Sequence, residues 1–169
     1  MSISSPRPVT LRPVIAVSGV GCDNGLFLFK TSTMNPVESV TEGLSANQSL
    51  VVKDEHTAPH VGSGVAPVLA TPILVNLFEA AALAAIEHQL PRGYQSLGTR
   101  MDMEHFAATP RGMRVEVVAR VTGVEGRTIR FELTARDAVE EIGRGRHERV
   151  VVSVDRFDQR VRDKGSLVD

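Results

Sequence analysis

The most apolar stretch of the sequence contains one ionisable residue. Residues 73–85 read ILVNLFEAAALAA, in which only Asn76 and Glu79 are polar. A carboxylate in apolar surroundings is costly unless it has a partner, and such groups cluster at functional sites. We therefore take Glu79 as a candidate catalytic residue and Asn76 as a candidate substrate-binding residue. In the alternative interpretation, Glu79 reaches solvent or forms a structural ion pair.

A histidine follows in a stretch where apolar and polar residues alternate. His105 shares a predicted strand face with Leu97, Met101 and Met103, and we expect this face to look toward the apolar helix. His105 would there lie across from Glu79, in one subunit or across two, and a histidine–carboxylate pair is suited to general acid–base catalysis. The alternative is a hydrogen-bonded core histidine without a catalytic role.

Thr71 and Pro72 mark the start of the apolar helix. Threonine suits the N-cap position, and proline suits the first helical position because its missing N–H costs nothing there. The free N–H groups at a helix N-terminus favour negative charge, such as the oxyanion that develops on a carbonyl under attack. Thr71 is therefore a candidate for orienting water or an acyl group, in addition to capping the helix.

Arg149 lies on the last predicted strand and shares a face with His147 and Val151. It could pair with an active-site carboxylate or contact a ligand, and a solvated arginine is the alternative. The sequence has no glycine-rich phosphate loop, no nucleophile elbow and no zinc-binding motif. The three remaining histidines lack metal-ligand spacing. We expect neither a metal nor a cofactor.

The predicted helix covers residues 73–89 and ends at residues 90–93 (LPRG), a strong breaker. Because its first half is apolar on almost every face, we expect it to be buried all round. A strand is predicted over residues 49–57. It is followed by a loop rich in glycine and proline over residues 58–67, which could act as a lid or substrate-entry segment.

The sequence after Gly93 has the pattern of an antiparallel sheet. Strands are predicted over residues 97–106, 113–122 and 129–136, and a last strand over residues 142–157 is followed by a charged tail. One buried helix followed by four long antiparallel strands is an α+β plan. To cover the helix the sheet must wrap around it, which is the hot-dog fold. The open edge strand predicts a homodimer.

These elements divide the chain into an N-terminal extension over residues 1–48, a hot-dog domain over residues 49–164 and a tail over residues 165–169. Residues 1–33 contain three prolines and no sustained period. We expect them to be poorly ordered, with Met34 as a plausible start.

Composition excludes several classes of function. The 169 residues suit one domain, and 19 basic against 20 acidic residues give a net charge of −1. Nucleic acid and anionic membranes are therefore not expected partners, and no stretch has the length of a membrane span. The single cysteine, Cys22, cannot form an internal disulfide, which favours a reducing, cytoplasmic location.

Several short motifs together resemble the fluoroacetyl-coenzyme A thioesterase family of hot-dog proteins. The resemblance covers roughly residues 50–164 and is specific only as a combined pattern. It rests on the following residues: Leu69-Ala70-Thr71, Glu79, Ser96-Leu97-Gly98-Thr99, His105, Ala107-Ala108-Thr109-Pro110, Gly112, Val124-Glu125-Gly126-Arg127, Glu141-Ile142-Gly143 and His147-Glu148-Arg149.

The resemblance implies a dimeric acyl-coenzyme A (acyl-CoA) thioesterase in which Thr71, Glu79 and His105 are catalytic. It also implies supporting, substrate-binding positions at Gly98 and Arg149. This chain departs from the family in the loop before Thr71. Gly62 and Val65 occupy the positions where the resemblance implies lid phenylalanines, and we count Val65 among the substrate-binding residues. We therefore expect a short acyl group without selectivity for fluorine.

The expected activity is hydrolysis of a short-chain acyl-CoA, including substituted acetyl groups, to free acid and coenzyme A. The role of Glu79, as nucleophile or as general base, stays open at this stage, as does the assembly of two dimers. Two alternatives remain. One is hydratase or dehydratase chemistry on the same fold, and the other is a non-catalytic dimer that binds or senses acyl-CoA.

Overall fold

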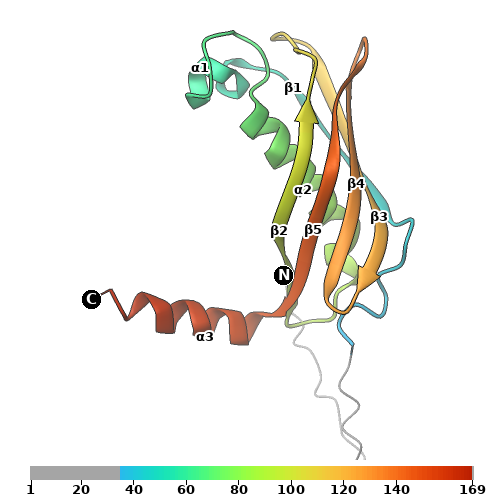
Figure 1. The fold of residues 1–169 in the computed structure, drawn as a ribbon, viewed down its shortest axis with the longest axis vertical. Helices are drawn as coiled ribbons and strands as arrows, with labels where there is room; N and C mark the ends of the chain where they lie inside the picture. The colour runs from blue at the N-terminus through green and yellow to red at the C-terminus, as the bar shows by residue number, and fades with distance from the viewer. Residues whose placement is uncertain (1–34, 169) are drawn as a thin grey trace, which may run out of the picture. The chain divides into compact units, whose positions relative to one another are not determined.

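The computed structural model describes residues 35–168, and the predictions for residues 1–33, for Met34 as a start and for Cys22 lie outside them. The described part consists of one long helix and a five-stranded antiparallel sheet, with short helical turns and a C-terminal helix (Figure 1). In chain order the elements are β1 (Ser45–Val51), η1 (Asp54–His56), α1 (Ala58–Val61), α2 (Thr71–Ile86), η2 (Glu87–Gln89), β2 (Tyr94–His105), β3 (Arg114–Glu125), β4 (Thr128–Asp137), β5 (Glu141–Ser153) and α3 (Val154–Gly165).

The sheet has the strand order β1-β3-β4-β5-β2, so that β1 and β2 form its two edges. The predicted alternation of β3 and β4 is confirmed, because their side chains are buried and exposed in strict turn along most of each strand. The inner face of β3 and β4 is therefore apolar.

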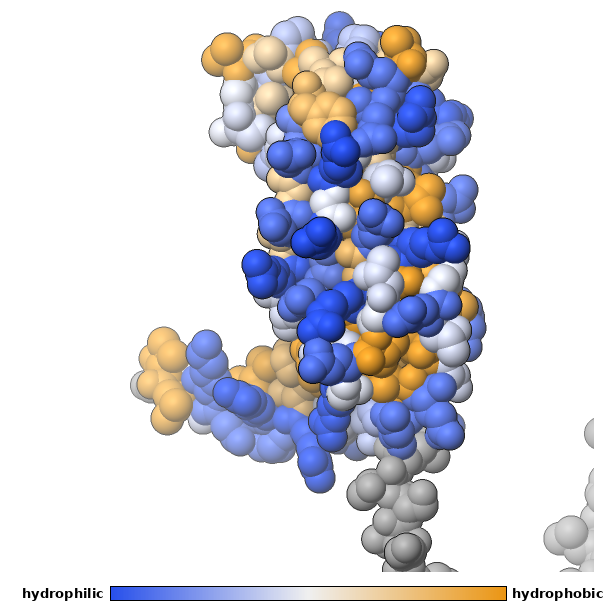
Figure 2. Space-filling view, turned by 45° about the vertical axis from the view of Figure 1, so that its right-hand side comes forward, coloured by the Kyte–Doolittle hydropathy of each residue, from blue (hydrophilic) through white to orange (hydrophobic). Residues whose placement is uncertain are grey.

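The outer face of the sheet carries charges of alternating sign. One cross-strand row contains Arg120, Glu132, Arg146 and Asp102, all of them exposed. Figure 2 shows a largely hydrophilic surface along the body of the molecule, with small apolar areas between the charged side chains. This alternation explains how a small sheet carries many charges with little repulsion.

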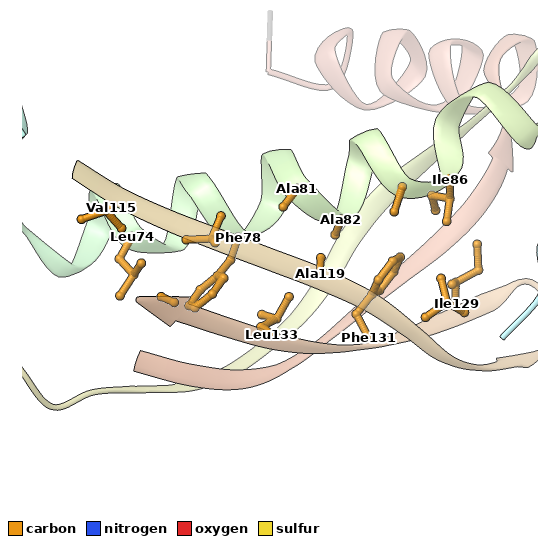
Figure 3. Packing of buried hydrophobic residues seen from close by; sticks show 14 of the residues in the cluster. Leu74, Phe78, Ala81, Ala82, Ile86, Val115, Ala119, Ile129, Phe131 and Leu133 are labelled. Atoms are coloured by element: carbon orange, nitrogen blue, oxygen red, sulfur yellow. The ribbon is translucent and has the colours of Figure 1, made fainter. Parts of the chain in front are cut away.

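Helix α2 packs on the inner face of the sheet (Figure 3). Phe78 and Phe131, the two largest core side chains, are each no more than 1% exposed. Each such side chain contributes roughly 1.5–3 kcal/mol by leaving water. The prediction that the helix is buried all round is wrong for the single chain, because the sheet covers only one side. On the uncovered side Leu83 is 39% exposed, and Ile73 and Leu77, which pack against the margin of the core, are partly exposed.

The N-terminus of α2 differs from the prediction in one respect. The helix begins at Thr71 with Ala70 at the N-cap, and no side chain donates or accepts a capping bond. The predicted N-cap role of Thr71 is therefore wrong. Thr71 lies one position inside the helix, and Pro72 has no N–H that would need a cap. The Thr71 hydroxyl is therefore free to bond elsewhere.

Strand β2 has a bulge that changes which residues face the helix. Its pairing with β5 shifts register between Gly98 and Arg100, which leaves Thr99 as the extra residue. On the N-terminal side of the bulge the inner face carries Ser96 and Gly98, and beyond it the inner face carries Met101, Met103 and His105. The predicted shared face of Leu97 and Met101 is wrong, because the extra residue inverts the alternation.

The boundaries of the folded domain also differ from those predicted. Val37 and Val40 are buried in the core, and β1 covers 45–51 instead of 49–57. The predicted boundary at residue 49 is therefore too late. At the other end, β5 stops at Ser153 and helix α3 replaces the predicted strand end and charged tail. A hydrogen bond of 2.7 Å between Gln159 and Asp163 spans one turn of α3.

Candidate active site

Thr71 and His105 form one half of the candidate site. The Thr71 Oγ1 and the His105 Nδ1 are 3.0 Å apart, which joins the first residue of α2 to the last residue of β2. The two elements meet here because α2 and β2 run in opposite directions along the sheet (Figure 1). The prediction had placed both residues in the site but had not paired them with each other.

The pair opens onto a cavity of about 450 Å³. Residues 63–66 and 68–70 form one wall and residues 106–108 form another, so small side chains dominate the lining. Among residues 35–168, Phe106 is the one Phe, Tyr or Trp side chain at the cavity, and it is 48% exposed. Val65 lies at the rim and is 96% exposed, which leaves the entrance without a bulky cover.

The imidazole of His105 is prepared for proton transfer. Burial lowers the pKa of His105, and a weaker interaction with the Ala107 backbone opposes that shift. The Nε2 atom is buried and has no hydrogen-bond partner among residues 35–168. The ring is therefore held at Nδ1 by Thr71, while Nε2 keeps an unsatisfied hydrogen-bonding capacity.

Glu79 forms the other half of the candidate site, in the middle of α2. Its carboxylate lies against the backbone of Gly98, so closely that a Cβ built on Gly98 would be 2.6 Å from Glu79 Oε1. A side chain at this point of β2 would displace the Glu79 carboxylate and press on the ring of His147, 3.1 Å from the same Cβ position. Glu79 is half-buried, and no ion pair joins it to another residue of the described chain.

Arg149 lies on the inner face of β5 near Glu79 and is only 6% exposed, so the alternative of a solvated arginine is excluded. Its Nε donates to Ser96 Oγ at 2.9 Å and its Nη2 donates to the Ser96 carbonyl at 2.9 Å. Burial lowers the pKa of Arg149, and the negative charges of Glu79 and Glu87 oppose that shift. The guanidinium is thus a fixed, buried positive charge.

Two residues of this network were not predicted. Ser96 donates its hydroxyl to Glu87 Oε2 at 2.7 Å, so that η2 and β2 together anchor the arginine. A sequence signal was available for Ser96, which belongs to the SLGT motif of the resemblance, but the unrecognised bulge hid its inward direction. Glu87 follows the apolar helix directly and gave no such signal.

The structure does not bring Glu79 and His105 together within one chain. Of the two arrangements expected for this pair, within one subunit or across two, the first is therefore excluded. Glu79 contacts Gly98, and His105 lies seven residues further along β2. At about 3.3 Å per residue, Gly98 and His105 are on the order of 20 Å apart along the strand. The reason is the helix itself, since Thr71 and Glu79 are about 12 Å apart along its axis.

The remaining predicted residue, Asn76, is exposed on the uncovered side of α2 and does not line the cavity beside Thr71. Within residues 35–168 no three metal-ligating side chains are grouped. None of the described helices is long and apolar enough to cross a membrane.

Comparisons with known proteins agree with this geometry. The family model described as "Fluoroacetyl-CoA-specific thioesterase" matches residues 52–155. A fluoroacetyl-CoA thioesterase of Streptantibioticus cattleyicolor is 43% identical over 97 residues, which are 57% of this chain and 70% of the relative.

Solved structures match over a longer part of the chain. The fluoroacetyl-CoA thioesterase FlK superposes with a TM-score of 0.69 at 36% identity, covering 73% of this chain and 96% of that one. A Thermus thermophilus thioesterase superfamily member gives a TM-score of 0.72 at 30% identity, covering 76% and 96%. A hot-dog-like protein from Thermanaerovibrio acidaminovorans gives a TM-score of 0.72 at 25% identity, covering 78% of this chain and 97% of that one.

The predicted hot-dog fold and the predicted family resemblance are both confirmed. The chain belongs to the fluoroacetyl-CoA-specific thioesterase family.

Proposed function

We propose that this enzyme hydrolyses short-chain acyl-CoA thioesters, substituted acetyl groups included, to a free acid and coenzyme A. The observation that carries the proposal is the Thr71–His105 pair at the N-terminus of α2, which opens onto a cavity of about 450 Å³. Membership of a thioesterase family supports the reaction type.

In this proposal the thioester carbonyl binds beside the N-terminus of α2. The unpaired N–H groups of the first turn stabilise the negative charge that develops on the carbonyl oxygen. Thr71 orients the reacting groups through its hydroxyl. His105 transfers a proton through Nε2 to the departing sulfur, so that the carbon–sulfur bond breaks as free thiol is released.

Glu79 supplies the second functional group of the reaction. As a general base it takes a proton from water, whose oxygen then forms the new bond to the carbonyl carbon. As a nucleophile it forms a mixed anhydride that a water molecule hydrolyses in a second step. Both routes consume one water molecule and give the same two products.

A second copy of the chain is needed in this proposal, because one chain does not unite Glu79 with His105. Strand β2 is a free edge of the sheet, and Gly98, which touches Glu79, is exposed there. Two β2 edges that pair antiparallel with Gly98 opposite His105 keep the inner faces on the same side. Neighbouring strands are about 4.8 Å apart, so this pairing brings the Glu79 of one copy near the His105 of the other.

The uncovered side of α2 supports pairing as well. Leu83 is 39% exposed, and Ile73 and Leu77 are partly exposed on the same helix. Apolar side chains on a helix are stabilised when a second surface removes them from water. We therefore include a homodimer with two sites in the proposal.

The substrate is proposed to be a small acyl group held without a selective gate. The curated relative is named for fluoroacetyl-CoA, and one solved variant of FlK holds fluoroacetate and CoA. In the described part of this chain the loop side of the cavity carries Val65 and Gly64, and Phe106 on the opposite wall is its one phenylalanine. We therefore propose that acetyl and substituted acetyl groups are accepted alike.

A thiol-release panel tests the reaction. The full chain is incubated with acetyl-, fluoroacetyl-, propionyl- and decanoyl-CoA, and free thiol is followed with a chromogenic disulfide. Thiol release from the short esters, with little from decanoyl-CoA, supports the proposal. Binding without thiol release from any ester, or formation of an α,β-unsaturated acyl-CoA from a 3-hydroxyacyl-CoA without thiol release, contradicts it.

A further inference from the structure

His147 is a buried histidine that the reaction above does not use. Its side chain lies on the inner face of β5 and is 1% exposed. The ring packs against Phe131 of β4, with 6.0 Å between ring centroids. Its Cε1 would be 3.1 Å from a Cβ built on Gly98, so the ring borders the same glycine that Glu79 touches.

The hydrogen bonds of His147 fix its tautomer. Nδ1 is 2.7 Å from the carbonyl oxygen of Arg100, and because a carbonyl only accepts, Nδ1 carries the proton. Nε2 is 3.4 Å from Arg149 Nη1, and because a guanidinium only donates, Nε2 must present its lone pair. Both contacts are therefore satisfied only by neutral imidazole with its proton on Nδ1.

This contact completes the support of the Arg149 guanidinium. Nε and Nη2 each donate to Ser96, and His147 accepts from Nη1. A guanidinium has five N–H groups, so two remain for other partners. Glu79 is near enough to act on the charge of Arg149 but forms no ion pair with it within the described chain.

We propose that His147 is a positioning residue. Its neutral imidazole holds the guanidinium of Arg149 in the plane that faces Glu79, and protonation of the ring removes this support. The inference rests on the proposed function, because that function gives Glu79, the neighbour of Arg149, a place in the site.

The charges around His147 favour the neutral form. Burial lowers the pKa of His147 most, and the positive charge of Arg149 lowers it further. The hydrogen bond to Arg100 and the negative charges of Glu79 on α2 and Glu148 on β5 oppose this shift. Phe131, the neighbour from β4, carries no charge. A protonated ring would place an N–H against the Nη1 N–H of Arg149, so mild acid should weaken the contact.

A double-mutant cycle tests whether His147 acts through Arg149. His147→Phe keeps a ring without an acceptor, and kcat should fall about 10- to 100-fold while KM changes little. His147→Gln can still accept from Nη1 and should keep a kcat at least about fivefold higher than that of His147→Phe. In an Arg149→Met background, His147→Phe should lower kcat by less than about twofold. His88→Gln, on the exposed η2, is the matched control.

The proposal is overturned if the His147→Phe enzyme is folded and the two substitutions act independently. In that case the fold loss of kcat in the double variant equals the product of the losses in His147→Phe and Arg149→Met. Equal losses in the Phe and Gln variants would overturn it as well. A measurement on the unmodified protein keeps the proposal testable if the variants fail to fold or if no turnover is found. Nitrogen-15 NMR of labelled histidine should show His147 as the neutral Nδ1–H tautomer at pH 7, and an imidazolium or an Nε2–H tautomer would contradict the proposal.

Discussion

The two halves of the site are built in different ways. At the N-terminus of α2, one hydrogen bond joins Thr71 to His105, and small residues surround an open cavity. In the middle of the helix, Glu79 lies beside a buried network in which Arg149 is 6% exposed and held by Ser96. The first half has space for a substrate, and the second has fixed charge.

This difference indicates where the protein can tolerate change. The Thr71–His105 half depends on one contact that a substrate can complete, so changes there should affect chemistry more than folding. The Arg149 half depends on several hydrogen bonds in apolar surroundings, and removing one partner leaves a buried polar group unsatisfied. Changes there should affect both folding and catalysis.

The largest effect is expected for Glu79→Gln. The amide keeps the shape of the side chain but neither takes a proton nor attacks a carbonyl at a useful rate, so kcat should fall about 1,000-fold. Thiol release under saturating substrate measures it, with circular dichroism to show that the fold is kept. A kcat within a few-fold of the unmodified enzyme would remove Glu79 from the mechanism.

The second-largest effect on kcat is expected for Gly98→Ala, which disturbs the Glu79 half of the site. Its new Cβ would meet Glu79 Oε1 at 2.6 Å, so the carboxylate must move, and kcat should fall about tenfold or more. The matched control is Gly165→Ala, because a Cβ at Gly165 meets nothing within 4 Å. Equal kcat values in the two variants would show that the position of Glu79 at Gly98 is not needed.

The pH dependence of stability should reflect both halves. Burial lowers the pKa of His105 and of His147 below the ordinary value of 6.5, so in mild acid the unfolded chain binds more protons than the folded one. The free energy of unfolding should fall as pH drops through 6.5 toward the folded-state values, and should be nearly constant above it. Urea unfolding at pH 7.5, 6.5 and 5.5 measures this. Stability that rises on acidification would contradict it.

The smallest effect is expected at the cavity rim. Val65 is 96% exposed and makes no selective cover, so kcat/KM for fluoroacetyl-CoA and acetyl-CoA should agree within about tenfold. Val65→Phe should widen that ratio by restricting the entrance, and Val161→Phe on the exposed α3 is the control. A ratio far above tenfold in the unmodified enzyme would show that another residue provides the gate.

Regular patterns in the sequence predicted the fold well. The strict alternation of 115–121 and 129–135 predicted β3 and β4, because one face of each strand must be apolar. The apolar run before residue 86 predicted α2. The bulge at Thr99 could not be predicted, since a single extra residue leaves no trace in composition and only its partner strand reveals it.

The site was predicted by residue type more than by arrangement. Glu79 was recognisable because a carboxylate stands out in an apolar helix, and Thr71 because helices have a defined start. The separation of Thr71 and Glu79 along α2 was implicit in the helix rise, and it excludes a pairing of Glu79 with His105 within one subunit. The bond of Thr71 to His105 depends on two distant segments meeting, which the sequence alone does not specify.

The central claim is that each site combines Glu79 of one chain with Thr71 and His105 of another, and a mixed dimer tests it most directly. Glu79→Gln and His105→Asn chains carrying different tags are co-expressed, and the heterodimer is purified through both tags. It has one intact and one doubly defective site if the claim holds, so its kcat should be about half that of the unmodified dimer. If each site lay within one chain, both sites would be damaged and the heterodimer would be no more active than the two variants alone.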